Sequence, residues 1–315
     1  MVTLGSLASV VDTALDRAVV PGFSAIGYAV RRRLPTWPAD PAPDALRGAH
    51  VAVTGATSGL GHATARQLSG LGAHTHLIVR DPAKAREVTA DLPGPSTVWL
   101  CDLADLDSVR RCAAEIATAA PPLAGLVHNA GFLPPERTES PQGHELTMAV
   151  HVLGPVLLTE LLQPLLAAQR ARVVFVTSGG MYAQPLPVRD PGYTRGEYSG
   201  TIAYARSKRT QVELLGILGE RWAPLRLSAM HPGWAETPGV TQSLPTFDRV
   251  MGPILRDVDA GADTTTWLLA SEPAPPSGAL WMDRRERPTA FLGRNAPSEE
   301  ERRAMWEWVA EAAGL

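Results

Sequence analysis

Short apolar runs alternate with amphipathic stretches along most of the chain from residue 50 onward. Stretches with helical spacing of apolar positions include 60–71, 105–118 and 145–168. Short buried-type strands that alternate with helices predict a mainly parallel sheet of about seven strands, covered by helices on both faces. We therefore expect an α/β, doubly wound fold with its site at the carboxyl ends of the strands. The runs that predict strands are 50–54, 75–79, 96–100, 125–129, 172–177, 226–230 and 279–282.

The N-terminal segment falls outside this alternation. Residues 4–19 carry apolar side chains at helical spacing, and a basic run, 31–33, follows shortly after. One interpretation is a helix that lies on a lipid surface with its cations toward the headgroups. The other, which the ordinary amphipathicity favours, is a helix packed on the domain or on a second subunit. Residues 34–48 are rich in proline and are typical of an ordered arm or linker.

These patterns divide the chain into three parts. We expect residues 1–47 to form a helical arm with a proline-rich linker, residues 48–285 to form the α/β domain, and residues 286–315 to end in a closing helix. Ser298 and Glu301 have the spacing of a capping box at the start of that helix.

Composition narrows the class of protein. A chain of 315 residues, 45% of them hydrophobic, can bury a large core. The net charge of −3 gives no reason to expect nucleic acid as a partner. The two cysteines lack metal-type spacing and suit a reduced compartment. His74 and His76 alternate along a strand, but no third ligand is suggested near them, so no metal site is predicted.

The chain contains no run close to the roughly 20 uninterrupted apolar residues that a membrane span needs. No secretory signal is visible at the N-terminus either. We expect a cytoplasmic protein, and peripheral contact of residues 4–33 with a membrane stays open.

Three glycines join the first predicted strand to the helix after it. The stretch VTGATSGLG places Gly55, Gly59 and Gly61 directly after the strand at 50–54. Glycine lets backbone come close to a pyrophosphate, and the helix N-terminus stabilises the charge of that group. The spacing is TGxxxGxG, and in this strand–loop–helix context it predicts a Rossmann-type dinucleotide site.

A tyrosine and a lysine four residues apart suggest acid/base chemistry. Of the 29 basic residues, only Lys84 and Lys208 are lysines. On a helix, Tyr204 and Lys208 share a face. An ammonium favours the phenolate and lowers the phenol pKa toward neutral pH, and unlike a guanidinium it can release a proton. Ser178 follows the strand at 172–177, where its hydroxyl could hold a substrate oxygen.

Six motifs in register resemble the short-chain dehydrogenase/reductase family over roughly residues 48–285. Within that family the likeness is to the branch of member 12 and its bacterial relatives, near the retinol dehydrogenase branch. The motifs are TGATSGLG at 54–61, CDLAD at 101–105, HNAG at 128–131, the serine that ends VFVTS, YARSK at 204–208, and HPGWAETPG at 231–239.

The resemblance implies an NAD(P)-dependent oxidoreductase that interconverts a carbonyl and an alcohol. Hydride passes between the nicotinamide and the carbonyl carbon, Tyr204 exchanges the proton, Ser178 orients the oxygen, and Lys208 tunes the tyrosine. A homo-oligomer is also expected. The implied cofactor-binding residues are Gly55, Thr57, Ser58, Gly59, Leu60, Gly61, Arg80, Asp102, Leu103, Asn129, Ala130, Gly131, Tyr204, Lys208, Pro232, Gly233 and Thr237.

The residues after the second strand bear on the choice of cofactor. The position where the family carries an acidic residue for NAD holds Val79, and Arg80 follows. A guanidinium there can clamp the 2′-phosphate of NADP. The rival is Asp81, about 20 residues past the loop, which could bind a ribose and favour NAD. We expect NADP(H), with NAD(H) as the alternative.

Two histidines depart from the family pattern. His128 replaces the first asparagine of the usual motif, which puts one structural hydrogen bond in doubt. His151 occupies the slot of the asparagine that supports the proton relay. A histidine can carry a proton itself, so we expect His151 to act as a substitute relay group.

The substrate is the least determined part. The 25 residues between Ser178 and Tyr204 exceed the usual connection, and we expect a loop over the pocket. Apolar candidates for the pocket wall suggest a lipid-like carbonyl. These candidates are Met181, Tyr182, Trp234 and Phe247.

Two other classes stay open. The first is a dinucleotide-binding regulatory or scaffold protein with little turnover, against which the Ser–Tyr–Lys set weighs. The second is an extended-branch epimerase or dehydratase, whose TGxxGxxG spacing is absent from the sequence.

Overall fold

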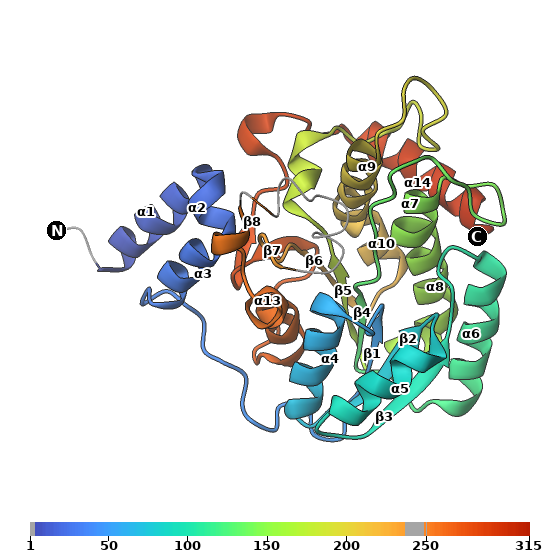
Figure 1. The fold of residues 1–315 in the computed structure, drawn as a ribbon, viewed down its shortest axis with the longest axis horizontal. Helices are drawn as coiled ribbons and strands as arrows, with labels where there is room; N and C mark the ends of the chain where they lie inside the picture. Colours follow the sequence, from blue (N-terminus) through green and yellow to red (C-terminus); the bar gives the residue numbers. More distant parts are fainter. Residues whose placement is uncertain (1–3, 237–248, 250) are drawn as a thin grey trace.

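One sheet of eight strands organises the part of the chain that the structure describes (Figure 1). The structure is a computed structural model that describes residues 4–236, 249 and 251–315. The strand order is β3-β2-β1-β4-β5-β6-β7-β8, and every neighbouring pair is parallel except β7 and β8. The bounds are β1 (His50–Thr54), β2 (His74–Val79), β3 (Ser96–Leu100), β4 (Gly125–His128), β5 (Arg172–Val176), β6 (Arg226–Met230), β7 (Ala279–Met282) and β8 (Arg285–Arg287).

Helices cover both faces of the sheet, as a doubly wound fold requires. On one face, α4 (Gly59–Gly70), α5 (Pro82–Asp91) and α13 (Val258–Ala270) bury apolar side chains against β1, β2, β4 and β5. The other face is covered by α6 (Leu106–Ala119), α8 (Gly154–Ala167), α9 (Gly200–Glu213), α10 (Leu215–Arg221) and α14 (Glu299–Ala313). Further short elements among the described residues are α7 (Leu146–Met148), η1 (Ala149–Leu153), η2 (Gly179–Ala183), η3 (Gly252–Ile254) and η4 (Phe291–Gly293).

The long apolar stretch predicted at 145–168 is a core helix. Residues Leu146–Ala167 form a helix of 22 residues that is long and apolar enough to cross a membrane. In the fold, 67% of its apolar window is buried, and its side chains pack within the core beneath α6 and α14. We therefore assign it to the core of the domain.

The N-terminal residues form a separate helical arm. This arm consists of α1 (Leu4–Arg17), α2 (Val19–Phe23) and α3 (Ala25–Arg32), and it lies beside β8 and α13, away from the C-terminus (Figure 1). A buried network of ion pairs holds it there. Arg31 pairs with Asp12 at 2.8 Å and with Asp283 at 2.7 Å, and Arg287 pairs with Asp12 at 2.9 Å and with Asp16 at 2.6 Å.

Candidate active site

The loop between β1 and α4 brings backbone to the carboxyl edge of the sheet. Gly55 has a φ of +64°, and a Cβ there would lie 2.7 Å from the Cα of Ala130. A Cβ on Gly61 would lie 2.3 Å from the side-chain nitrogen of Asn129. The Ser58 side chain makes no capping hydrogen bond. The first backbone N–H groups of α4 are therefore available to donate to a ligand. This close backbone approach and open helix N-terminus fit the pyrophosphate of a dinucleotide.

Asn129 fastens this loop to the end of β4. Its side-chain amide donates to the carbonyls of Thr54 at 3.2 Å and of Gly55 at 3.3 Å. The Thr54 hydroxyl accepts from the backbone amides of Asn129 at 3.0 Å and of Ala130 at 3.1 Å. These bonds hold the stretch 129–131 beside the glycine loop.

Arg80 and Asp81, which follow β2, differ in whether their side chains have hydrogen-bond partners. Asp81 is the N-cap of α5, and its carboxylate accepts from the amides of Ala83 at 2.9 Å and of Lys84 at 3.3 Å. Arg80 lines the pocket, is exposed, and makes no hydrogen bond or ion pair with any residue that the structure describes. The carboxylate that could bind a ribose is therefore committed to a helix, while the guanidinium is available.

A pocket of about 540 Å³ at the carboxyl edge of the sheet gathers most of the predicted residues. Gly61 does not line it, because its role is the close contact with Asn129. Thr237 lies outside the described residues. The predicted residues in the wall are Gly55, Thr57, Ser58, Gly59, Leu60, Arg80, Asp102, Leu103, Asn129, Ala130, Gly131, Ser178, Tyr204, Lys208, Pro232 and Gly233.

Ser178, Tyr204 and Lys208 meet in this pocket. Ser178 follows β5, and the other two share one face of α9, as the spacing predicts. The Ser178 hydroxyl and the phenol of Tyr204 lie close enough for hydrogen bonding to lower the pKa of the phenol. Lys208 Nζ donates to the carbonyl of Val176 at 2.8 Å and lies 5.6 Å from the centroid of the Tyr204 ring.

The ionisation of this pair differs from the sequence-based expectation. Burial raises the pKa of the Tyr204 phenol, and the hydrogen bond with Ser178 opposes that rise. Burial lowers the pKa of Lys208 to about 7. Burial therefore dominates the phenol pKa in this structure. The lowering of that pKa by Lys208, whose Nζ is also bonded to a backbone carbonyl, stays a prediction.

His151 lies behind the tyrosine and outside the pocket wall. Its Nε2 accepts from the backbone amide of Phe132 at 3.1 Å, so the proton of the neutral ring sits on Nδ1. That nitrogen lies 2.7 Å from the hydroxyl of Ser207, which donates to the carbonyl of Tyr204 at 2.8 Å. Burial, followed by the charge of Lys208, holds the pKa of His151 well below its usual value. Both nitrogens have fixed partners, so this geometry gives no support to the predicted relay role.

His128, at the position where the family carries an asparagine, forms a hydrogen bond with Thr159. Its Nε2 lies 2.7 Å from the hydroxyl of Thr159, and that hydroxyl donates to the carbonyl of Pro155 at 2.9 Å. Because the hydroxyl proton is used there, the imidazole is the donor, and β4 is tied to α8. Burial, followed by the charge of Lys208, lowers the pKa of His128 to about 3.

The apolar wall differs from the predicted one. Trp234 lines the pocket, as expected, whereas Met181 is fully buried in the core and Tyr182 donates to the carbonyl of Pro288 at 2.8 Å. Phe247 lies outside the described residues. The wall also contains residues that were not predicted, and two of them directly follow the stretch 129–131. Among these residues are Phe132, Leu133, Val150 and Thr201.

The expected loop over the pocket is instead fixed to the body of the domain. Arg206 lies over the ring of Tyr193 at 4.3 Å from its centroid, and Arg137 donates to the carbonyl of Tyr193 at 3.1 Å. The Tyr198 hydroxyl donates to the carboxylate of Glu145 at 2.8 Å. Among residues 179–203, only Gly180 and Thr201 line the pocket.

Known proteins are similar to this chain in sequence and in fold. Residues 49–246 match the short chain dehydrogenase family. Dehydrogenase/reductase SDR family member 12 from Bos taurus is 37% identical over 274 residues, which cover 83% of this chain and 85% of that protein. Polyprenol dehydrogenase from Mus musculus is 33% identical over 272 residues, which cover 81% and 80%. The crystal structure of an uncharacterised protein from Mycobacterium paratuberculosis has a TM-score of 0.71 at 26% identity and covers 86% of this chain and 95% of that one.

A doubly wound sheet with a dinucleotide cradle beside a Ser–Tyr–Lys set defines an NAD(P)-dependent oxidoreductase. Its substrates are carbonyls or alcohols. The chain belongs to the short-chain dehydrogenase/reductase family.

Proposed function

We propose that the protein reduces an apolar, lipid-like aldehyde or ketone with NADPH, or oxidises the corresponding alcohol, with Tyr204 as the acid/base. When bound, the nicotinamide supplies or accepts the hydride. The observation that carries the proposal is the meeting of Ser178, Tyr204 and Lys208 in the pocket that begins at the glycine loop. A substrate oxygen placed between the two hydroxyls would contact both, so one could orient it while the other exchanges a proton.

Lys208 is suited to resupply that proton. With a pKa of about 7, its side chain is divided between the ammonium and the amine near neutral pH. Its bond to the Val176 carbonyl fixes the nitrogen at the pocket wall beside the tyrosine. A group that changes protonation at working pH is an efficient partner for acid/base catalysis.

An NADPH-oxidation screen tests this proposal. The purified chain is mixed with aldehydes and ketones of increasing chain length, and turnover is expected to rise with the apolar length of the substrate. NADPH binding without turnover on any carbonyl would instead favour the regulatory binder.

The preference for NADP(H) rests on Arg80 and Asp81. The guanidinium has no ionic partner among the described residues and lines the pocket, while the carboxylate caps α5. A charge-assisted bond between the guanidinium and a 2′-phosphate would favour NADP. We expect Arg80→Ala to weaken NADPH binding about 10- to 100-fold. NADH binding should change little, and equal losses for both nucleotides in a fluorescence titration would overturn the preference.

An apolar substrate is proposed from the pocket wall near Tyr204. Phe132, Leu133 and Trp234 line this pocket, and such side chains bury apolar ligand surface. The relative from Mus musculus is named polyprenol dehydrogenase, which fits a long apolar alcohol. We expect Trp234→Ala to raise KM for long-chain aldehydes more than for short ones. Equal effects on both would argue against this wall as the substrate site.

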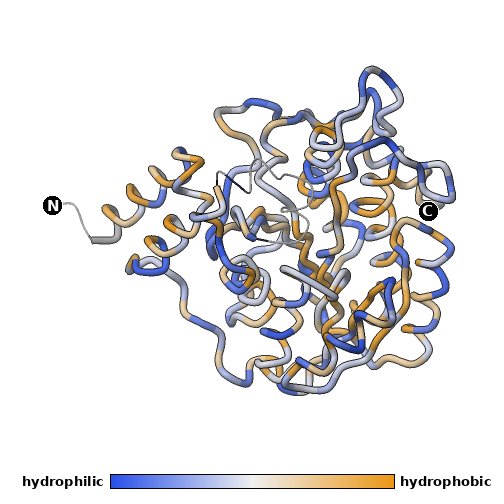
Figure 2. Tube along the Cα trace, viewed as in Figure 1, coloured by the Kyte–Doolittle hydropathy of each residue, from blue (hydrophilic) through white to orange (hydrophobic). Residues whose placement is uncertain are grey.

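The helical arm is proposed to rest on a membrane at the cytoplasmic side. Arg17, Arg32 and Arg33 are exposed on it, while its two acidic residues pair with buried arginines. Figure 2 shows apolar positions recurring along the arm. Exposed apolar groups beside cations are typical of helices that lie on anionic lipid. Five of the eight large hydrophobic side chains that are exposed in the described residues lie on the arm: Leu7, Val10, Val19, Val20 and Ile26.

The arm also reaches the pocket. The Phe23 carbonyl accepts from the backbone amide of Trp234 at 2.7 Å, and the two rings pack edge to face with centroids 5.9 Å apart. A Cβ on Gly179 would lie 2.7 Å from the Phe23 ring. A membrane contact at the arm would thus lie next to the apolar wall of the pocket, where a lipid-like substrate would enter.

Vesicle co-sedimentation tests the membrane contact. We expect the chain to sediment with phosphatidylserine-containing vesicles, and Val10→Asp with Val20→Asp to abolish this binding. Leu161→Asp, at a comparably exposed apolar position on α8, is the control and should still bind. Equal binding by the arm variant and the control would overturn the assignment.

A further inference from the structure

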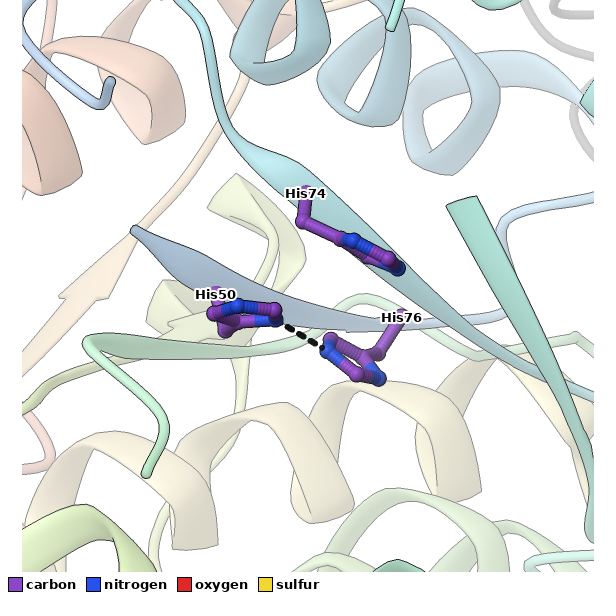
Figure 3. Close-up of side chains that lie close together, drawn as sticks. All are labelled: His50, His74 and His76. Carbon is purple, nitrogen blue, oxygen red and sulfur yellow. Dashed lines mark hydrogen bonds between the residues drawn. The ribbon is translucent and has the colours of Figure 1, made fainter. Parts of the chain in front are cut away.

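Three histidines gather at the amino ends of β1 and β2, at the opposite edge of the sheet from the pocket (Figure 3). His50 and His74 are register partners on adjacent parallel strands. His76 lies two residues after His74 and therefore on the same face of the sheet. Each residue offers one nitrogen, and these three nitrogens lie within 4.8 Å of one another. The sequence alone indicates no third ligand for His74 and His76, because the parallel register that supplies His50 is a tertiary feature.

The hydrogen bonds around the cluster define where its protons lie. The Trp99 indole donates to Nδ1 of His76 at 3.0 Å, so this neutral ring carries its proton on Nε2. That nitrogen lies 2.9 Å from Nδ1 of His50, which accepts the proton and leaves Nε2 of His50 protonated. His74 Nε2 lies 2.8 Å from the hydroxyl of Thr97. The three rings thus lie against one another, with centroids 4.8 to 5.2 Å apart, and against fixed neighbours.

We propose that His50, His74 and His76 form a binding site for a divalent transition-metal ion of the zinc type. Two ligands two residues apart on one strand, with a third on the adjacent strand, project from one face and can converge on one ion. Three imidazoles leave the fourth tetrahedral position of zinc to water. The site is distinct from the dinucleotide pocket, whose wall includes none of these histidines.

Access and the neighbouring groups both suit metal binding. His50 and His74 are partly exposed, so an ion can reach the cluster from solvent. The Thr97 hydroxyl can hold Nε2 of His74 while Nδ1 binds the ion, as outer-shell partners of metal ligands do.

The hydrogen bond from the Trp99 indole to His76 disfavours metal binding by His76, so replacing Trp99 tests the site. If Nε2 of His76 binds a metal, the proton of its ring must move to Nδ1, which the Trp99 indole now contacts as a donor. Two donors would then face each other. The indole also stacks on the ring of His76, with centroids 6.0 Å apart and planes 15° apart. Trp99→Phe keeps an aromatic ring there and removes the competing N–H.

Zinc binding to the full-length chain is the measurement, by titration calorimetry after dialysis against a chelator. The wild-type chain is expected to bind one zinc ion, reversibly with EDTA, and its Tm is expected to rise with zinc. His74→Ala should weaken binding about 100-fold, whereas Trp99→Phe should strengthen it about tenfold, in the range of outer-shell effects on metal sites. His144→Ala removes a partly exposed histidine elsewhere and is the matched control, with no expected change.

Three results would overturn the assignment. One is the absence of saturable zinc binding to the wild-type chain and to Trp99→Phe. Another is an equal loss in His74→Ala and His144→Ala. The third is weaker binding in Trp99→Phe, which would mean that the indole supports the ion rather than competing with it. Cobalt, which absorbs visible light when tetrahedrally bound, gives a second readout that an effect on folding alone would not produce.

Discussion

At the scale of single residues, the scarcity of lysine identifies the functional one. Lys208 is fully buried against a backbone carbonyl and beside a tyrosine, whereas Lys84 is exposed on α5. The i, i+4 spacing predicted that Tyr204 and Lys208 share a face, because helix geometry alone fixes that relation. It could not predict the pKa values, because these depend on burial and on the Ser178 hydroxyl, both of which are tertiary features.

Replacement of Lys208 by arginine tests the need for a proton that can be released. Lys208→Arg keeps a positive charge but raises the pKa of the group far above neutral pH. We expect kcat to fall about 100-fold at pH 7, within the range of acid/base effects. Lys84→Arg, at the other lysine of the chain, should have no effect. Equal activity of both variants in steady-state assays would contradict the role of Lys208.

A second change separates structure from catalysis at His151. His151→Leu leaves the amide of Phe132 without its acceptor, and a buried unsatisfied donor costs about 1–3 kcal/mol. The Ser207 hydroxyl loses its bond with the imidazole but keeps its bond to the carbonyl of Tyr204. Denaturant unfolding should therefore show a loss of stability, while the pH profile of kcat in the folded variant keeps its shape. If the pH profile of kcat for His151→Leu lacks one ionisation seen in the wild-type chain, His151 takes part in the proton relay.

At the scale of elements, the strands of the parallel sheet could be read closely from the sequence. The predicted runs match β1 to β7 within one residue at each end, because buried parallel strands are continuous apolar runs. β8 was missed, since Arg285 and Arg287 flank an acidic residue and give no apolar signal. The partners of those arginines are Asp12 and Asp16, in an arm more than 260 residues away in the sequence. Ion pairs of this kind cannot be read from local pattern.

The buried ion pairs of Asp283 should contribute strongly to the stability of the folded chain. Burial alone would raise the pKa of Asp283, but Arg256 and Arg31 outweigh it and lower that pKa. Asp283→Ala leaves Arg256 buried without an acidic partner among the described residues, which costs about 3–5 kcal/mol, whereas Arg31 keeps Asp12 and Asp16. Glu299→Ala, which breaks an exposed pair with Arg303, should cost about 0.5 kcal/mol or less. Urea unfolding of both variants measures the difference, and equal midpoints would contradict the proposed docking of the arm.

At the scale of the whole molecule, buried neutral histidines connect stability to pH. Burial lowers the pKa of His76 to about 4 and those of His128 and His231 to about 3. Below the ordinary value of 6.5, the unfolded chain binds protons that the folded chain does not, so stability falls as pH falls. Each group contributes a loss of about 1.4 kcal/mol per pH unit below 6.5, down to its folded pKa.

Thermal unfolding between pH 7.5 and pH 4.5 checks this linkage. We expect Tm to be nearly constant down to about pH 6.5 and then to fall steeply. A Tm that stays constant to pH 4.5 would show that these histidines are not neutral and buried in the folded chain.

The most direct test of the proposed chemistry is single-turnover hydride transfer in the wild-type chain and in Tyr204→Phe. Both are saturated with NADPH and mixed with a long-chain aldehyde, and NADPH fluorescence reports first binding and then oxidation. We predict equal NADPH affinity and a hydride-transfer rate at least about 100-fold lower in the variant, because only the phenolic proton is lost. Oxidation of NADPH at the wild-type rate in Tyr204→Phe would contradict Tyr204 as the acid/base.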